Sequence, residues 1–486
     1  MVVIILMTSL LYYVTIANFN RREYAGWGTI TKKKVTMLPE LHQKQRLTPF
    51  QSTSVAGNDL LGSVLYTTGI VCAACGQLGP IAMLMAVIAL LPFRAIFKEN
   101  GLALPLNGGV YVNMLNATSK IAATFAVSCS LISYSATAVV SAASCTSYAA
   151  GAFGEFPLQL VSVAVLALFA GLVLLGIKDS ANVAAAIFAV HLLTLAVLML
   201  ACVVEIGRNG GSMFAQNWNT PLPNVGTNGY VALDLWLGFS VSLLGLTGFE
   251  TAINYVEEAG PFVRPIQACD GAEGTTGSVP VLPPRTVSVF EKTMDNMYWL
   301  VLAVNPTMIL LAVGTTDLAT IVSNPNNILS VIGQRVGGQW LSWMVSIDAV
   351  LVLSGGVLTA YVGVTGLIKQ LAHDRCLPRF LTIRNDTFQT NHWIILSFFL
   401  LCTTLYLVTS GDVTILSGVF SLAFLMVLLS FALANMILKV NRPRLPRPVW
   451  TTWPVVLTGR SIVFVTLTPL LCIYVLYVGV VVVPEL

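Results

Sequence analysis

Four acidic residues and one histidine lie inside long apolar segments of this 486-residue chain: Asp59, Asp234, Glu250, Asp348 and His191. Even the smaller estimates put the cost of an ionised acid at such a position at a few kcal/mol, so these residues are usually functional. Glu250 lies about twenty residues into its segment, and a proton or a partner cation must offset its charge. We interpret Glu250 as a carboxylate that alternates between a protonated and a cation-bound form. His191 is either a proton relay or a hydrogen-bonded structural residue, and Asp348 is placed to reach an outer vestibule.

Oxygen-bearing side chains accompany two of these acids at helical spacing. Asp59 and Tyr66 are seven residues apart and share one helix face, because successive residues turn by about 100°. Thr137 and Ser141 are at i and i+4, where hydroxyls either bond to their own i−4 carbonyls or face a solute. A set of carboxylate, phenol and hydroxyl oxygens from three helices suits a hard cation or a substrate ammonium. The candidate binding residues are Asp59, Tyr66, Thr137, Ser141, Thr247 and Glu250.

The composition defines the elements that must position these residues. Only 9% of the residues are charged and 56% are hydrophobic, whereas an ordinary soluble domain is about 25% charged. A water-soluble fold of this length is therefore excluded, and the solidly apolar segments exclude a transmembrane β-barrel, whose strands alternate. We predict an all-α polytopic membrane protein with eleven or twelve spans. The eleven clear spans are 56–76, 79–97, 120–148, 157–176, 182–205, 230–256, 296–317, 339–368, 392–409, 412–438 and 461–483.

The loops between these spans differ in charge. If the segment before the first span is cytoplasmic, 23 of the 25 Lys and Arg residues lie on the inner side, and only Arg208 and Arg335 lie outside. The positive-inside rule therefore predicts a cytoplasmic loop before the first span. A net charge of +4 is too small to indicate nucleic acid, and the nine cysteines, mostly in apolar runs, indicate packing. The loops contain no nucleophile–base or metal-ligand set, so neither an enzyme nor a cofactor is predicted.

The spans divide into two halves of five. Because five is odd, the second half enters the membrane from the opposite side, which produces an inverted repeat. Glycines interrupt the first helix of each half, Gly57, Gly62 and Gly69 in 56–76 and Gly238, Gly245 and Gly248 in 230–256. Such paired interruptions point to a binding site near the midplane. The predicted organisation is an additional N-terminal anchor at 1–19, a cytoplasmic segment at 20–55, the first half and the start of the second repeat at 56–256, a disordered cytoplasmic loop at 257–295, the rest of the second repeat at 296–438, and a loop with the last span at 439–486.

Several motifs resemble those of amino acid–polyamine–organocation (APC) superfamily permeases. Residues 105–111 (PLNGGVY) resemble the P-x-x-G-G-x-Y of these permeases, 248–250 (GFE) with 257–259 (EEA) resemble their sixth-helix signature, and 372–380 (AHDRCLPRF) resemble their A-x-D-x-x-L-P-x-x-F loop. The resemblance implies the LeuT-like fold, a 5+5 inverted repeat with broken first and sixth helices. That fold agrees with the two halves of five spans.

The candidate binding residues resemble a particular group within this superfamily. Asp59 with Tyr66, Thr137 with Ser141, and Thr247 with Glu250 look like the site pairs of KUP-type potassium importers and their bacterial relatives, where they bind potassium and the sixth-helix acid is linked to proton symport. Two features depart from that group: Ser133-Tyr134 stands where the relatives have Asp-Tyr, and the chain stops at Leu486 without a twelfth helix and C-terminal domain.

These observations predict a secondary active transporter in a lipid bilayer. We expect proton-coupled import of a small cationic solute such as potassium by alternating access, with a potassium ion at the candidate site and Glu250 and His191 in proton coupling. An amino acid or polyamine permease, which would take a zwitterionic or cationic solute, is the alternative. A passive channel or a non-transporting sensor is a minor alternative, since a channel does not need two broken helices in opposed repeats.

Overall fold

The computed structural model describes residues 47–154, 156–176, 181–223, 231–256, 259, 288–385, 387–388 and 390–481. All regular structure in these residues is helical. The predicted anchor at 1–19, most of the cytoplasmic segment at 20–55 and most of the loop at 257–295 lie outside the described residues.

Eight stretches of the described chain are long and apolar enough to cross a membrane. The first of them, Pro49–Ala103, contains two segments that turn at Gly76 (φ 56°). Two further apolar helices, α7 and α19, occupy the remaining predicted spans. The spans are α2–α3 (Pro49–Gly62 and Val64–Cys75), α4 (Gly79–Ala103), α6 (Lys120–Phe153), α7 (Leu158–Leu174), α8 (Ala181–Arg208), α11 (Val231–Ser242) with η2 (Leu243–Leu246), α12 (Phe249–Ala252) and η3 (Ile253–Tyr255), α13 (Val289–Thr315), α16 (Gln339–His373), α17 (His392–Thr409), α18 (Val413–Asn441) and α19 (Trp453–Val481). The chain is thus an integral, multi-pass membrane protein.

Two helices begin earlier than their apolar runs because polar residues cap them. Thr48 and Gln51 form a capping box that starts α2 at Pro49, and Ser288 and Glu291 form another that starts α13 at Val289. In each box the two side chains satisfy backbone N–H groups that the first turn leaves unpaired. Residues 289–295 are therefore helical, although they fall within the predicted loop at 257–295.

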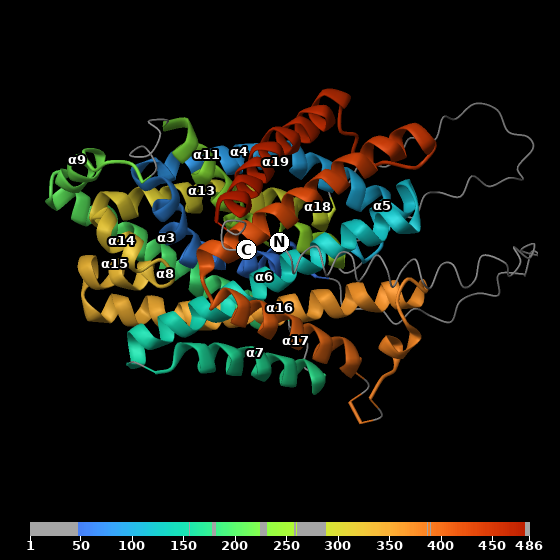
Figure 1. Ribbon diagram of the computed structural model, residues 1–486, viewed down its shortest axis with the longest axis horizontal. Coiled ribbons are helices and arrows are strands. Elements are labelled where there is room, and N and C mark those ends of the chain that lie inside the picture. Colours follow the sequence, from blue (N-terminus) through green and yellow to red (C-terminus); the bar gives the residue numbers. More distant parts are fainter. Residues whose placement is uncertain are drawn as a thin grey trace, which may run out of the picture.

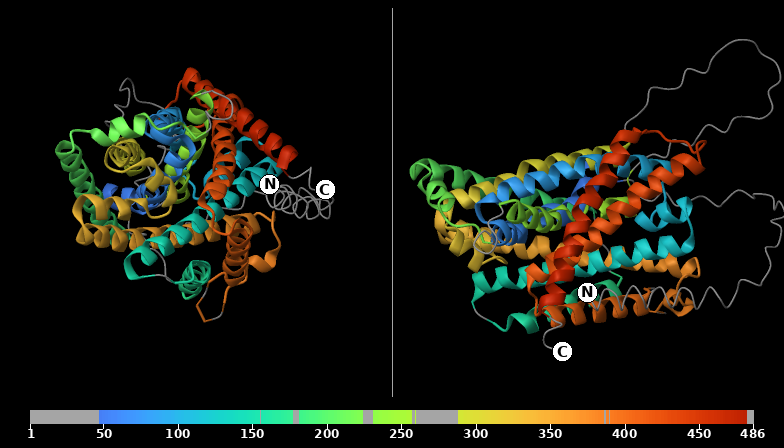
Figure 2. Two further views of the ribbon diagram at one scale, coloured as in Figure 1. Left: turned by 60° about the vertical axis from the view of Figure 1, so that its left-hand side comes forward. Right: turned by 45° about the horizontal axis from the view of Figure 1, so that its top comes forward.

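Equivalent helices of the two halves pack against each other, as expected for a pseudo-twofold arrangement. The third helices are the longest, α6 with 34 residues and α16 with 35, and they form an extensive mutual interface. The second helices, α4 and α13, also pack together. Figure 1 shows α6 and α16 side by side across the bundle, and Figure 2 shows the same bundle from two further directions.

Short helices cover the ends of the bundle. Figure 1 places α9 (Ser212–Trp218), α14 (Leu318–Ser323) and α15 (Ile328–Gly337) at one end and α5 (Gly109–Ala117) at the other. The charge pattern assigned these two sets of connections to opposite sides, so their separation agrees with the predicted alternation of spans. Large apolar side chains such as Leu160 (69% exposed) and Leu193 (65% exposed) face outward along the spans, as lipid-facing residues do.

Two of the recognised motifs meet at the α5 end. The Tyr111 hydroxyl donates a hydrogen bond to Asp374 Oδ2 at 2.8 Å and lies 3.6 Å from Cys376 Sγ, and Lys120 Nζ donates to the Asp374 carbonyl at 3.2 Å. Burial, with these contacts to Cys376 and Asp374, raises the pKa of Tyr111 well above its ordinary value. Tyr111 therefore remains a protonated donor and ties α5 to the end of α16.

Candidate functional site

The helix that opens the second half is broken at one of the predicted glycines. The 3-10 turn η2 ends at Leu246, Thr247 is extended (φ −54°, ψ 154°), and Gly248 is left-handed (φ 93°) before α12 begins. A Cβ atom at position 248 would lie only 2.8 Å from the Ala56 carbonyl oxygen in α2. Asn305 Nδ2 donates to the Gly245 carbonyl at 2.9 Å, which satisfies one acceptor that the break leaves free.

The helix that opens the first half is interrupted much less. Only Ser63 separates α2 from α3, and its dihedral angles remain helical (φ −63°, ψ −24°). The amides of Tyr66 and Thr67 donate to the Ser63 carbonyl at 3.3 and 2.9 Å. Two amides on the α3 side of this junction, those of Tyr66 and Thr67, are therefore engaged in local hydrogen bonds.

Three of the predicted residues meet where α2–α3 passes the break at Thr247. Thr247 Oγ1 donates to the Asp59 carbonyl oxygen at 3.3 Å. The Tyr66 hydroxyl is buried beside the side chain of Thr247. The Asp59 side chain is 8% exposed and accepts no hydrogen bond from the described residues. A carboxylate, a phenol and a hydroxyl are thus close together in the structure.

Glu250 is held by a residue that the sequence analysis did not select. Ser133 Oγ of α6 donates to Glu250 Oε1 at 2.9 Å. Glu250 is 5% exposed, and its other oxygen, Oε2, is buried without a hydrogen-bond partner among the described residues. A signal for Ser133 was present, because it precedes Thr137 by four residues and therefore shares its helix face. Asp59 lies near enough to Glu250 for the two carboxylates to interact electrostatically.

The two other hydroxyls of α6 have different roles. Thr137 Oγ1 donates to the Ser133 carbonyl of its own helix at 3.1 Å, which is the structural alternative considered for it. Ser141 Oγ makes no hydrogen bond with a described residue. It faces Gly356 of α16, because a Cβ atom at position 356 would lie 3.2 Å from Ser141 Oγ and 3.8 Å from Asp59 Oδ1. Ser141 and Asp59 therefore converge on the same side of α16.

His191 and Asp348 form a second polar pair between α8 and α16. His191 Nδ1 lies 2.7 Å from Asp348 Oδ2, and both side chains are almost completely buried. His191 Nε2 and Asp348 Oδ1 have no hydrogen-bond partner among the described residues. Asp348 precedes Gly356 by eight residues, or about 12 Å along a helix. This pair is therefore separate from the cluster at Asp59 and Glu250.

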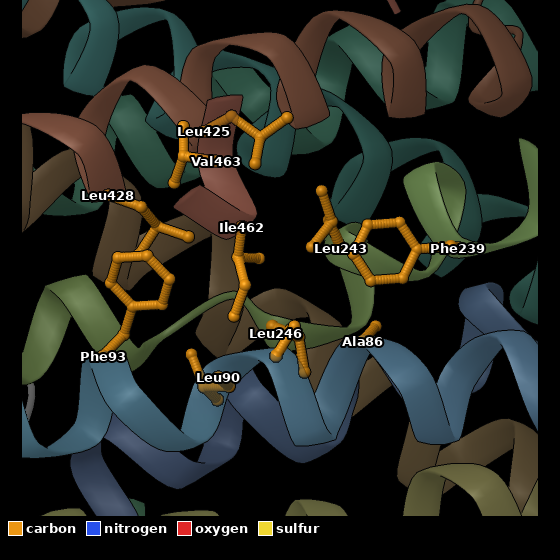
Figure 3. Close-up of a pocket in the computed structure, with 11 residues that line it drawn as sticks. Ala86, Leu90, Phe93, Phe239, Leu243, Leu246, Leu425, Leu428, Ile462 and Val463 are labelled. Carbon is orange, nitrogen blue, oxygen red and sulfur yellow. The ribbon is translucent and has the colours of Figure 1, made fainter. Parts of the chain in front are cut away.

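A small apolar pocket lies elsewhere in the bundle. Figure 3 shows Leu90 and Phe93 of α4, Leu243 and Leu246 of η2, and Leu425 and Leu428 of α18 around it. None of its lining residues is polar, so it has no group that could orient a charged solute. None of the predicted site residues lines it.

The helical bundle, the opposed repeats and the buried polar groups at a broken helix define a membrane transporter. The sequence profile of the Amino acid permease family matches residues 47–484, and the chain belongs to this family. The predicted superfamily is thereby confirmed, whereas the resemblance to KUP-type importers stays a prediction. No curated protein matches the sequence.

Solved structures share this fold. A manganese transporter of Eremococcus coleocola, in complex with an aromatic bis-isothiourea substituted compound, superposes with a TM-score of 0.54 at 13% sequence identity, covering 90% of this chain and 88% of the transporter. A mutant form of the same transporter gives the same values. At this identity the similarity concerns the fold.

Proposed function

We propose that the protein is a secondary active transporter that imports a small cationic solute, such as potassium, together with a proton by alternating access. The observation that carries this proposal is the pair of buried carboxylates, Asp59 and Glu250, on either side of the break at Thr247 and Gly248. A broken helix can change its packing on one side of the site without unfolding. Following the charge pattern of the loops, we place the segment before α2 in the cytoplasm.

The partners of the two carboxylates suggest a division of roles. Asp59 accepts no hydrogen bond from the described residues, so its oxygens are available to a solute cation. Glu250 is held by Ser133 through one oxygen, while the other is buried and unpaired. A buried, half-paired acid is stabilised by a proton. Asp59 therefore binds the cation, with Tyr66, Thr247 and Ser141 around it, and Glu250 carries the proton. In this proposal His191, paired with Asp348, serves as the accessory proton residue.

An amino acid is the second candidate solute, and membership of the Amino acid permease family favours it. A carboxylate-bearing solute needs donors such as free backbone amides, yet the amides of Tyr66 and Thr67 are bonded to the Ser63 carbonyl. The acids Asp59 and Glu250 would also repel its carboxylate. A cationic group thus has more to bind here than an anionic one, which is the reason for preferring a cation.

Functional rescue separates these candidates. Expressed in cells that lack potassium uptake, the protein should restore growth at limiting potassium, and Glu250→Gln and Asp59→Asn should each abolish that growth. Glu205→Gln is the matched control, because the Glu205 side chain accepts a hydrogen bond from the nearby Asn209 near the end of α8. Rescue of an amino acid auxotroph in place of the potassium-deficient cells would overturn the cation proposal.

Proton coupling is tested separately with purified protein in liposomes. A proton gradient directed into the liposomes should drive uptake of a rubidium tracer by the wild type and not by Glu250→Gln. Uptake that is indifferent to the gradient would remove Glu250 from its proposed role while leaving cation transport intact.

A further inference from the structure

Gly356 occupies a position on α16 that the candidate residues did not include. It is buried in the middle of a 35-residue helix, where α16 packs against both α2 and α6. A Cβ atom there would come within 3.2 Å of Ser141 Oγ, closer than ordinary van der Waals contact, and within 3.8 Å of Asp59 Oδ1. The missing side chain therefore lets the α16 backbone lie close beside these two oxygens.

The two oxygens have unused capacity to bind a ligand. Asp59 is 8% exposed, and its carboxylate accepts no hydrogen bond from the described residues. Ser141 is 2% exposed and makes no hydrogen bond with them either. Buried polar groups are nearly always paired, with protein, water or a ligand. A carboxylate and a hydroxyl that converge next to a glycine are suited to a monovalent cation or a primary ammonium group.

The neighbouring glycine, Gly355, has no such contact with the two oxygens. A Cβ atom at Gly355 would meet no atom within 4 Å, although Gly355 lies on the same helix and has the same helical backbone. Only the Gly356 side of α16 faces the two oxygens. Gly355→Ala is therefore the matched control for a methyl group at position 356.

We propose that Gly356 is a specificity-determining residue that makes α16 a wall of the cation site and, because it has no side chain, admits larger cationic groups to Asp59. This proposal rests on the proposed function and deepens it, because it adds a fourth helix to the site and names its ligand as a monovalent cation or a primary ammonium. A methyl group at 356 crowds Ser141 and lies beside Asp59, which leaves less room for larger cations.

Protection of Asp59 from a carbodiimide tests the proposal. The full chain, purified in detergent, is treated with the reagent in the presence of sodium, potassium, caesium, methylammonium or propylammonium, and modification of the Asp59 peptide is measured by mass spectrometry. In the wild type and in Gly355→Ala, small and large cations should protect. In Gly356→Ala, protection by the larger cations should weaken by about tenfold or more, and protection by the smallest should change much less.

Gly355→Ala controls for a general packing defect, because it adds the same methyl group to α16 at a position where the new Cβ atom meets nothing within 4 Å. Elution as a single species confirms that each variant is folded. Protection that is equal in Gly356→Ala and Gly355→Ala, or equally weakened in both, would overturn the role of Gly356. A wild type that no cation protects would instead overturn the proposed function.

Discussion

Gly248 lies at the break in the first helix of the second half and packs against α2 of the first half. Its replacement by alanine is a direct test of the fold around the site. Its φ of 93° is one that alanine rarely adopts, at a cost of about 1–2 kcal/mol. The new Cβ would also lie 2.8 Å from the Ala56 carbonyl oxygen and 3.1 Å from the Leu60 amide nitrogen. Both are backbone atoms that cannot rotate away, and such overpacking costs about 1–3 kcal/mol.

The two effects together predict a loss of about 2–5 kcal/mol for Gly248→Ala. The melting temperature of the purified protein in detergent should fall by about 2–5 °C. Uptake of the tracer per folded molecule should fall as well, because relief of the contact moves Thr247 and Glu250 away from Asp59. Melting is followed by the loss of the monodisperse elution peak, and uptake is normalised to that peak.

Gly418→Ala is the matched control. Gly418 lies in the interior of α18, and a Cβ atom there meets nothing within 4 Å. The helix propensity of alanine should leave the stability of this variant unchanged or raise it by up to about 1 kcal/mol. If Gly248→Ala melted together with the wild type and with Gly418→Ala, the left-handed break packed against α2 would be refuted.

Two further predictions concern buried acids. Glu99→Gln should destabilise the protein by about 3–5 kcal/mol, because it leaves Lys439 and Arg447 buried without their common partner. Asp295→Asn, which removes the partly exposed acid that pairs with Arg94 and Lys98, should cost only about 0–1 kcal/mol; equal melting temperatures of the two variants would contradict this reasoning. Ser133→Ala should reduce uptake about tenfold or more, since it removes a hydrogen bond to a charged group worth about 1.5–3 kcal/mol. Ser133→Thr, which keeps the hydroxyl, should retain uptake, and an equal loss in both variants would argue against the hydrogen bond.

The spans were predictable because each buries a long apolar run whose length is set by the bilayer. The predicted span 392–409 coincides with α17. Boundaries were missed where polar residues extend a helix beyond its apolar part, as at Thr48 with Gln51 and Ser288 with Glu291. Such caps depend on backbone geometry at one or two residues, which hydropathy does not report.

Within the site, helical spacing identified the residues but not their partners. The spacing of Asp59 and Tyr66 reflects one helix and could be derived from that helix alone. The bond from Ser133 to Glu250 joins residues 117 positions apart, and the approach of Gly356 to Ser141 and Asp59 joins three helices. These contacts depend on how the helices pack, and the pattern of a single segment carries no information about them. Glycine is especially ambiguous in a sequence. Gly248 lies at a helix break, whereas Gly356 lies within a continuous helix where it contacts two other helices.

The separate partners of Asp59 and Glu250 give the proposed coupling a physical basis. Closing the site around two ionised carboxylates would bury two like charges near each other, which is strongly unfavourable in a medium of low dielectric constant. A cation at Asp59 neutralises one of them, and a proton on Glu250 neutralises the other. With only one of these bound, a net charge remains inside the membrane and occlusion is opposed. Under the proposed function, cation and proton therefore cross together because each offsets a charge that the other cannot reach, and one proton should accompany each cation.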